Sequence, residues 1–347
     1  MTMKNDGAKR SHKFRTICLN TALLLLSVIV SLGIAEFMAR QFFDISATPP
    51  FYVGEFENRV SENFVVDEHT GWRMRSSHTF MWRIGEEGED YTYKANVDGF
   101  RSNKEFSQQG AVVLVGDSFT FGTGVAYENT FGALLENHLG SAPVYNFAMP
   151  GFGIDQMWMA LQYQAFRFAP KLVVVAFVDE DFTRSLTAYR KYEGFNKPSY
   201  VFDHGTLSLR TQEDQPPSFI TWMRRNLALA NAFSLNMEQL GHHLPLGSWW
   251  TTNAEILRQI VLDAEEKGVP ILFVRLPSME QREFATLSSH MSSMGADFLD
   301  LGDRTRDDAG QGIFIPGDGH INEQGHRLVA DAIFNWMSAK QSEFIAE

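Results

Sequence analysis

Residues 112–122 read VVLVGDSFTFG, and this stretch decides how the rest of the chain is organised. Its apolar part is too short for a helix and ends abruptly in Gly116-Asp117-Ser118, which predicts a buried strand followed by a sharp turn. In an open parallel sheet, residues just past the carboxyl ends of the strands face the crevice in which ligands bind. The pattern therefore makes Ser118 a candidate nucleophile.

A serine nucleophile needs a base, usually a histidine whose second ring nitrogen is held by a carboxylate. The C-terminal part supplies such a pair, because Asp318 stands two residues before His320 in a glycine-rich loop that leads into a predicted helix. At opposite ends of an alternating strand and helix pattern, the two motifs together favour a catalytic site of Ser118, Asp318 and His320. We expect Asn322 to cap the helix, and Asn322 and His326 to fix the His320 loop.

These motifs resemble the SGNH/GDSL hydrolases, with a match that covers residues 111–337. Members of that family carry the serine in a Gly-Asp-Ser block after the first strand, and the Asp and His in the last block. The resemblance implies an ester hydrolase whose oxyanion hole contains the backbone amides of Ser118 and Gly151, the second of these in a block that begins at Asn146. It also implies a third donor, an asparagine side chain, but Glu180 occupies that position.

The departure at Glu180 has a chemical consequence. An ionised carboxylate cannot donate a hydrogen bond, and losing one oxyanion donor typically costs about 2.7 to 4 kcal/mol of transition-state stabilisation. Three explanations stay open: Glu180 turns away from the site, another group such as Asn146 donates, or the activity is modest. The last block also departs from the family, since Asp318-x-His320 is one residue shorter than the usual Asp-x-x-His.

The chain after residue 110 alternates between short apolar runs and helical patterns. This order predicts a parallel sheet with helices on both faces, a flavodoxin-like three-layer α/β sandwich with five strands. The predicted strands are 112–116, 143–147, 171–178, 269–276 and 297–301, and the predicted helices are 128–139, 154–168, 252–267, 278–294 and 322–338. Right-handed crossovers would bring Ser118, Gly151 and the turn at 179–182 to one edge of the sheet.

Residues 182–251 form an insertion between the third and fourth strands of the predicted hydrolase-like domain, 111–347. Long insertions at this edge are often lids. Three alternatives stay open for its aromatic residues: they line a glycan groove, form a small core of the insertion, or face a partner. Those residues are Tyr189, Tyr192, Phe195, Tyr200, Trp222, Trp249 and Trp250, among Arg184, Arg190, Lys191, Lys197, Arg224 and Arg225. Adjacent His242 and His243 do not share a helix face, and we expect neither a metal nor a cofactor.

The N-terminal sequence has the pattern of a membrane anchor. Residues 1–15 contain five basic residues and one acidic residue, and the 19 residues 17–35 then carry no charge. Such a run can span a membrane, and basic flanks stay cytoplasmic. We therefore expect a cytoplasmic tail at 1–15, a single-pass anchor at 16–38 in the inner membrane, and a periplasmic catalytic domain. A cleavable signal peptide ending at residues 33–35 is the alternative.

Residues 39–110 are predicted to form a small β-rich appendage. Predicted strands at 79–84 and 91–96 flank a turn rich in glycine and acidic residues, which indicates a hairpin. The tripeptides at 71–73 and 99–101 resemble the segment before the serine block in membrane-anchored members of the family. Such residues more often pack a small sheet against the main domain than contact substrate.

Composition narrows the expected function. The formal net charge of −12 argues against a nucleic-acid partner, because phosphate binding needs a basic face. The single cysteine, Cys18, excludes an intramolecular disulfide. Together with the resemblance, these features favour a serine esterase or O-acyltransferase that acts on acetyl esters of an envelope or exported polysaccharide, with a membrane acyltransferase or export protein as partner. The alternatives are a non-catalytic component of a polysaccharide machine, and a lipase or thioesterase.

Overall fold

The computed structural model describes residues 4–42, 62–84, 89–140, 142–185, 189–190, 195–210, 227, 229, 247–279, 287–307 and 309–340. The chain divides into two compact units. One contains Met1–Glu55 and Pro216–Leu244, and the other contains Phe56–Gln215 and Pro245–Glu347. The predicted features at Tyr192, Trp222, His242 and His243 lie outside the described residues.

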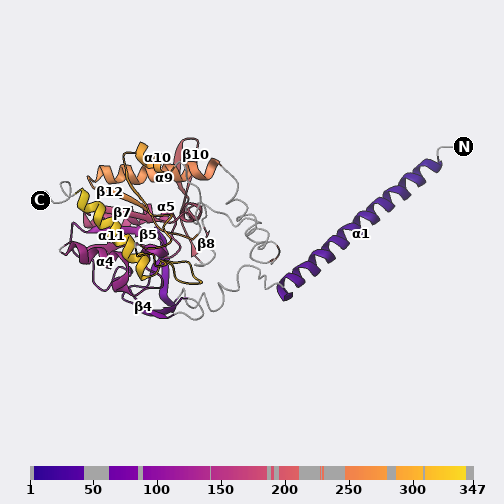
Figure 1. Ribbon diagram of the computed structural model, residues 1–347. Coiled ribbons are helices and arrows are strands. Elements are labelled where there is room, and N and C mark those ends of the chain that lie inside the picture. Colours follow the sequence, from indigo (N-terminus) through magenta and orange to yellow (C-terminus); the bar gives the residue numbers. More distant parts are fainter. Residues whose placement is uncertain are drawn as a thin grey trace. The chain divides into compact units, whose positions relative to one another are not determined.

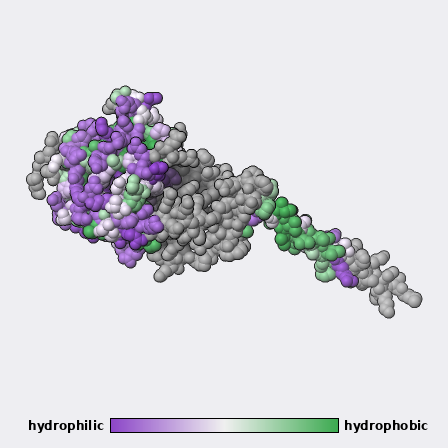
Figure 2. Space-filling view, turned by 90° about the horizontal axis from the view of Figure 1, so that it is seen from below, coloured by the Kyte–Doolittle hydropathy of each residue, from purple (hydrophilic) through white to green (hydrophobic). Residues whose placement is uncertain are grey.

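In the first unit, helix α1 spans Lys4–Phe42. Its residues Phe14–Met38 have a mean hydropathy of 2.4 and are long and apolar enough to cross a membrane, by length and composition. Their apolar side chains are exposed, and Figure 2 shows the hydrophobic surface that they form on this helix. A membrane anchor and a signal sequence both meet this criterion. Near the end of the helix, Glu36 Oε2 accepts a hydrogen bond from the backbone amide of Leu229 at 3.0 Å.

The second unit is built on a five-stranded parallel sheet (Figure 1), in the order β13-β12-β7-β5-β6. This is the flavodoxin-like strand order, with β5 in the switch position between β6 and β7. The strands are β5 (Val112–Gly116), β6 (Val144–Asn146), β7 (Leu172–Phe177), β12 (Ile271–Arg275) and β13 (Asp297–Asp300). The predicted fold class is confirmed.

Helices cover both faces of the sheet because alternate residues of each strand point in opposite directions. Val112 and Leu114 of β5 share one apolar cluster with residues of α4 and α11, whereas Val113 and Val115 share another with residues of α5, α9 and α10. The helices are α4 (Phe131–Leu139), α5 (Ile154–Ala160), α9 (Gly247–Glu266), α10 (Leu287–Ser293) and α11 (Glu323–Ala339). All four side chains of β5 are fully buried, which explains why the strand reads as an unbroken apolar run.

The helix predicted at 154–168 changes geometry along its length. The α-helical part α5 continues into a π-helix, η3 (Leu161–Ala165), and a 3₁₀ turn, η4 (Phe166–Phe168). Trp158 Nε1 and Gln162 Nε2 both donate to Asp263 Oδ2 on α9, at 2.7 and 2.9 Å. This shared acceptor ties the segment to the helix beside it.

Other helix ends also differ from the prediction. Helix α4 begins at Phe131 instead of 128, because Thr130 is its N-cap and accepts a hydrogen bond from the Ala133 amide. A separate 3₁₀ turn, η2, occupies Tyr127–Asn129. Within the segment predicted as helix 278–294, the described helical part is α10.

The insertion contributes short elements to the second unit. They are α6 (Asp181–Arg184), β8 (Tyr189–Arg190), β9 (Phe195–Asn196), β10 (Ser199–Asp203) and β11 (Thr206–Arg210). The ring of Tyr200 lies 4.5 Å from that of Trp158, and the ring of Trp250 lies 5.3 Å from that of His290 on α10. These two aromatic residues of the insertion therefore pack against the domain.

Two antiparallel hairpins precede the sheet. They are β1 (Phe64–Asp67) with β2 (Gly71–Met74), and β3 (Thr79–Arg83) with β4 (Asp90–Lys94), the second of which matches the predicted hairpin. Their buried aromatic residues belong to the same apolar cluster as Val113 and Val115. The hairpins and the sheet therefore share a core.

The hairpin β3–β4 and the residues after it support the turn that follows β5. Arg101 is buried, and its guanidinium donates to the carbonyls of Phe121 at 3.0 Å, Val125 at 2.7 Å and Gly122. The Tyr93 hydroxyl accepts from the Gly124 amide at 2.9 Å, and the Tyr93 ring lies 4.3 Å below the guanidinium. Burial lowers the pKa of Arg101 to about 10, so the side chain still carries its charge at neutral pH.

Arg101→Ala is expected to lower the free energy of unfolding by about 3 kcal/mol, because buried carbonyls lose a charged donor. Arg83→Ala is the matched control, since Arg83 is on the hairpin that precedes Arg101 but its ion pair with Asp90 is exposed. Urea denaturation of the full-length protein measures both. Equal midpoints for R101A and R83A would contradict the supporting role of Arg101.

Candidate active site

Ser118 lies where the sequence pattern places it, at the end of the central strand β5. It is the first residue of the short helix α3 (Ser118–Phe121), and Asp117 is the N-cap, with Oδ1 accepting from the Phe119 amide at 2.9 Å. A side chain at Gly116 would have its Cβ 2.6 Å from the Ala176 carbonyl oxygen of β7. The close approach of these two strands therefore requires glycine immediately before the Asp-Ser turn.

The structure brings Ser118, His320 and Asp318 together in one chain of hydrogen bonds. His320 Nε2 lies 2.7 Å from Ser118 Oγ, and His320 Nδ1 lies 2.5 Å from Asp318 Oδ1. The same carboxylate oxygen accepts from the His320 backbone amide at 3.1 Å. The shortened Asp-x-His spacing thus allows one aspartate to hold both the imidazole and the backbone of the histidine.

The loop that carries His320 is fixed at both of its ends. The Ile315 amide donates to the His320 carbonyl at 2.8 Å, and the His320 ring packs 4.8 Å from the ring of Phe119. Asn322 is the N-cap of α11, and its side-chain oxygen accepts from the Gly325 amide at 3.1 Å. Its side-chain Nδ2 donates to the Gly312 carbonyl at 3.0 Å. Asn322 therefore caps the helix and holds the loop, as predicted.

The pKa of Asp318 lies below its ordinary value. Partial burial by itself would raise that pKa, but the hydrogen bond from the His320 side chain, the charge of His320 and the hydrogen bond from the His320 backbone amide outweigh the burial. The carboxylate therefore stays ionised at neutral pH, as a group that orients an imidazole and stabilises its protonated form must be.

The two predicted oxyanion amides, those of Ser118 and Gly151, have no acceptor among the described residues. Ser118 is the first residue of α3, where helical amides have no intrahelical acceptor, and Gly151 takes a φ of +79° that favours glycine. Both amides therefore stay candidates for the oxyanion hole.

The remaining predicted donors behave differently. Asn146 is held by backbone groups, because its Nδ2 donates to the Thr120 carbonyl at 2.7 Å and its Oδ1 accepts from the Ala148 amide at 2.9 Å. Glu180 Oε2 accepts from Arg184 Nη2 at 2.8 Å, in an ion pair one helical turn apart. The suggestion that Asn146 replaces the missing donor stays a prediction. Glu180 is paired with Arg184, one of the basic residues of the predicted insertion.

His326 does not hold the His320 loop as expected. It is fully buried, and its Nδ1 accepts a hydrogen bond from the Phe131 amide at 3.2 Å, so it satisfies the first turn of α4. The partners are 195 residues apart. No local sequence signal connects a histidine in one helix with an amide at the start of another, which explains why the prediction missed this contact.

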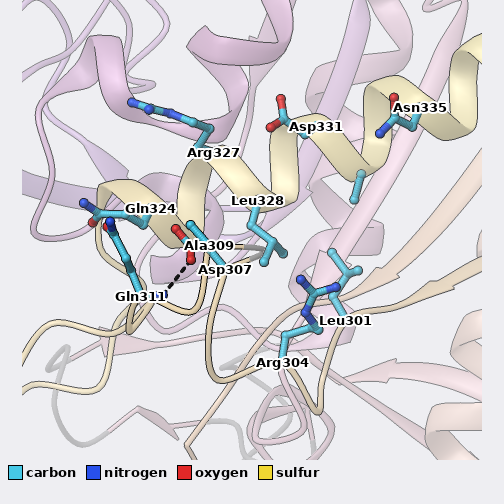
Figure 3. A pocket seen from close by; sticks show the side chains of 11 residues that line it. Leu301, Arg304, Asp307, Ala309, Gln311, Gln324, Arg327, Leu328, Asp331 and Asn335 are labelled. Carbon is cyan, nitrogen blue, oxygen red and sulfur yellow. Dashed lines mark hydrogen bonds between the residues drawn. The ribbon is translucent and has the colours of Figure 1, made fainter.

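A separate groove of about 480 Å³ runs along α11 (Figure 3) and contains none of the predicted catalytic residues. Its apolar lining residues include Leu301 and Leu328. The polar lining residues are Arg304, Asp307, Gln311, Gln324, Arg327, Asp331 and Asn335. Gln324 lies in the first turn of α11, four residues after His320, so the groove begins close in sequence to the catalytic loop.

The model of the family described as GDSL-like lipase/acylhydrolase matches residues 112–333. The chain therefore belongs to this family and is a hydrolase of ester bonds. A search of curated proteins finds no match. Among the described residues, no group of three or more His, Cys, Asp or Glu side chains has the arrangement of a metal site.

Several solved structures are similar to this chain. A lipolytic protein of the G-D-S-L family from Desulfitobacterium hafniense DCB-2 is 14% identical, with 65% of this chain and 99% of that chain covered and a TM-score of 0.41. The acetyl xylan esterase AlAXEase is 13% identical, with 65% and 98% covered and a TM-score of 0.39. A catalytic mutant of Axe2, an acetylxylan esterase from Geobacillus stearothermophilus, is 12% identical, with 67% and 95% covered and a TM-score of 0.40.

Stability is expected to fall below pH 6.5 because of His326. Burial, and then the charges of Arg101 and His320, lower its pKa from 6.5 to about 3. Between these values the unfolded chain binds one more proton than the folded chain, so this residue makes the free energy of unfolding fall by about 1.4 kcal/mol per pH unit as the pH drops. Above pH 6.5 the contribution is constant.

Urea denaturation from pH 4.5 to 7.5 checks this expectation. His326→Gln keeps an oxygen that can accept from the Phe131 amide but cannot be protonated in this range. The wild-type protein should lose stability more steeply than H326Q below pH 6.5. Parallel pH profiles of the two proteins would show that His326 does not titrate as its burial requires.

Proposed function

We propose that Ser118 is the nucleophile, His320 the general base and Asp318 the carboxylate that orients it. The single observation that supports this most directly is the unbroken chain from Ser118 Oγ to His320 Nε2 and from His320 Nδ1 to Asp318 Oδ1, at 2.7 and 2.5 Å. These are the distances at which a base removes a proton from a hydroxyl. Asp318 fixes the tautomer in which Nε2 carries the lone pair.

The reaction follows from this arrangement. His320 Nε2 takes the hydroxyl proton as Ser118 Oγ attacks the ester carbonyl, and the resulting oxyanion accepts hydrogen bonds from the amides of Ser118 and Gly151. The protonated His320 then gives its proton to the departing alcohol, which leaves an acyl group on Ser118. A water molecule, or the hydroxyl of a second substrate, attacks that acyl group with His320 again acting as base.

The proposed substrate is an acyl ester, most simply acetyl, on an envelope or exported glycan. The groove along α11 supports a polar substrate, because amide and guanidinium side chains such as Gln324, Arg327 and Asn335 suit sugar hydroxyls. Hydrolysis and transfer share the acyl-enzyme and differ only in the acceptor. Partitioning of the acyl group between water and added oligosaccharide distinguishes an esterase from an O-acyltransferase.

The proposed location is the inner membrane, with α1 as a retained anchor and the catalytic unit in the periplasm. The order of basic residues 1–15 and apolar residues 17–35 supports this orientation, because basic flanks remain cytoplasmic. An exported glycan would then be within reach, and a membrane acyltransferase or export protein is a suitable partner.

Asp318→Asn is expected to reduce kcat for 4-nitrophenyl acetate by about 10⁴-fold, because an amide neither holds the correct tautomer nor stabilises the imidazolium. Glu68→Gln is a matched control, since Glu68 also contacts a histidine, His69 at 3.3 Å, but its side chain is 85% exposed. Steady-state kinetics measure both. Equal kcat values for D318N and E68Q would remove Asp318 from the mechanism.

The orientation is tested by fusing alkaline phosphatase and green fluorescent protein after residue 45. The alkaline phosphatase fusion should be active, because this enzyme folds only in the oxidising periplasm, and the fluorescent fusion should be dark. The same fusions after residue 15 serve as the control for a cytoplasmic end. A bright fluorescent fusion with inactive phosphatase after residue 45 would contradict the periplasmic location and the glycan substrate together.

A further inference from the structure

Arg184 joins three carboxylates at the edge of the sheet that carries Ser118. Its Nη1 donates to Asp117 Oδ2 at 2.8 Å and to Asp181 Oδ1 at 2.6 Å, and its Nη2 donates to Glu180 Oε2 at 2.8 Å. The side chains of Asp117 and Asp181 are fully buried, whereas that of Glu180 is 48% exposed. One side of the guanidinium is therefore anchored in the core, and the other faces a carboxylate that reaches solvent.

Arg184 lies between the two segments that carry the available amides. On one side, its partner Asp117 directly precedes Ser118 and caps α3. On the other side, the Arg184 backbone packs against Gly153, two residues after Gly151, where a Cβ would lie 2.9 Å from the Arg184 carbonyl carbon. The Arg184 side chain thus contacts the residue directly before Ser118, and its backbone contacts the segment that follows Gly151.

An ionised Glu180 would repel an oxyanion on a Ser118 adduct, because both carry negative charge. Burial raises the pKa of Asp181, the adjacent Asp117 raises it further, and Arg184 opposes both effects, so that Asp181 titrates well above its ordinary range. The guanidinium stays charged throughout and presents rigid donors in a fork. Among Glu180, Asp181 and Arg184, Arg184 is the group that stabilises negative charge on the substrate.

We infer that Arg184 is the third oxyanion donor of this enzyme. In the free enzyme Glu180 accepts the hydrogen bond that Arg184 gives to the oxyanion when the substrate is bound. When the ester binds, Nη2 exchanges its hydrogen bond with Glu180 Oε2 for one with the developing oxyanion, and the half-exposed Glu180 side chain turns into solvent. No proton moves in this exchange. Nη1 keeps its hydrogen bonds to Asp117 and Asp181, which hold the guanidinium in place. This inference rests on the proposed acyl-enzyme mechanism.

The test uses full-length variants, with kcat and KM for 4-nitrophenyl acetate as the readout. Arg184→Ala should lower kcat by about 10² to 10³-fold with little change in KM, because the lost donor acts in the transition state. Ethylguanidinium added to R184A should restore part of the rate. Glu180→Gln should keep kcat at or above the wild-type value, because Nη2 loses a competing anion.

Arg275→Lys is the matched control for replacing a buried guanidinium, with its two donor arms, by a lysine amine. Arg275 Nε and Nη2 donate to Asp179 at 2.8 and 2.7 Å at the same edge of the sheet, and its side chain is 8% exposed against 10% for Arg184. R275K should keep a kcat near the wild-type value, whereas Arg184→Lys, which retains charge without the fork, should lose activity.

Two results overturn the inference: a wild-type kcat in R184A, or a tenfold or greater loss of kcat in E180Q. If R184A does not fold, R184K and E180Q decide, since reduced kcat in the first and undiminished kcat in the second support the role of Arg184. A folded wild-type protein without esterase turnover contradicts the proposed function itself, and this is seen before any variant is compared.

Discussion

The contact between His320 Nε2 and Ser118 Oγ joins residues that are 202 positions apart. It depends on how the sheet and the helices packed on it position the two side chains. Ser118 is fixed by the central strand, whose side chains are buried on both faces. His320 is fixed by α11, which packs on the same face of the sheet as α4. The hydrogen bond from the Phe131 amide to His326 ties these two helices together. A change in the register of α11 on α4 would move the imidazole away from the serine.

The hairpins before the sheet are part of this framework. Arg101 holds the carbonyls that follow Ser118, and Trp72 Nε1 donates to the Pro150 carbonyl at 3.0 Å, directly before Gly151. Each segment that carries a proposed oxyanion amide is therefore held by a residue from outside the sheet. Preorganised donors stabilise an oxyanion because they need not reorient during the reaction, so these distant contacts bear on the chemistry.

Much of the fold and the candidate site is predictable from local patterns. The strands are apolar runs bounded by turns, and the Gly-Asp-Ser turn and the Asp318-x-His320 loop mark the ends of elements that a parallel sheet brings together. What the sequence does not reveal depends on contacts between distant elements. His326 is read as a residue that fixes the His320 loop, because its partner is in another helix. Arg184 is read as one cation of an insertion, because its buried partner Asp117 is the N-cap of α3, far away in the sequence.

The central claim is that Ser118 is an activated nucleophile. The most direct measurement treats the folded full-length protein with a fluorophosphonate and locates the adduct by peptide mass spectrometry. The mechanism predicts one stoichiometric adduct on Ser118, absent from Ser118→Ala and strongly slowed in His320→Ala, since the attacking oxygen needs the imidazole. No adduct on the folded wild-type protein, or an adduct on another serine that persists in S118A, would contradict it.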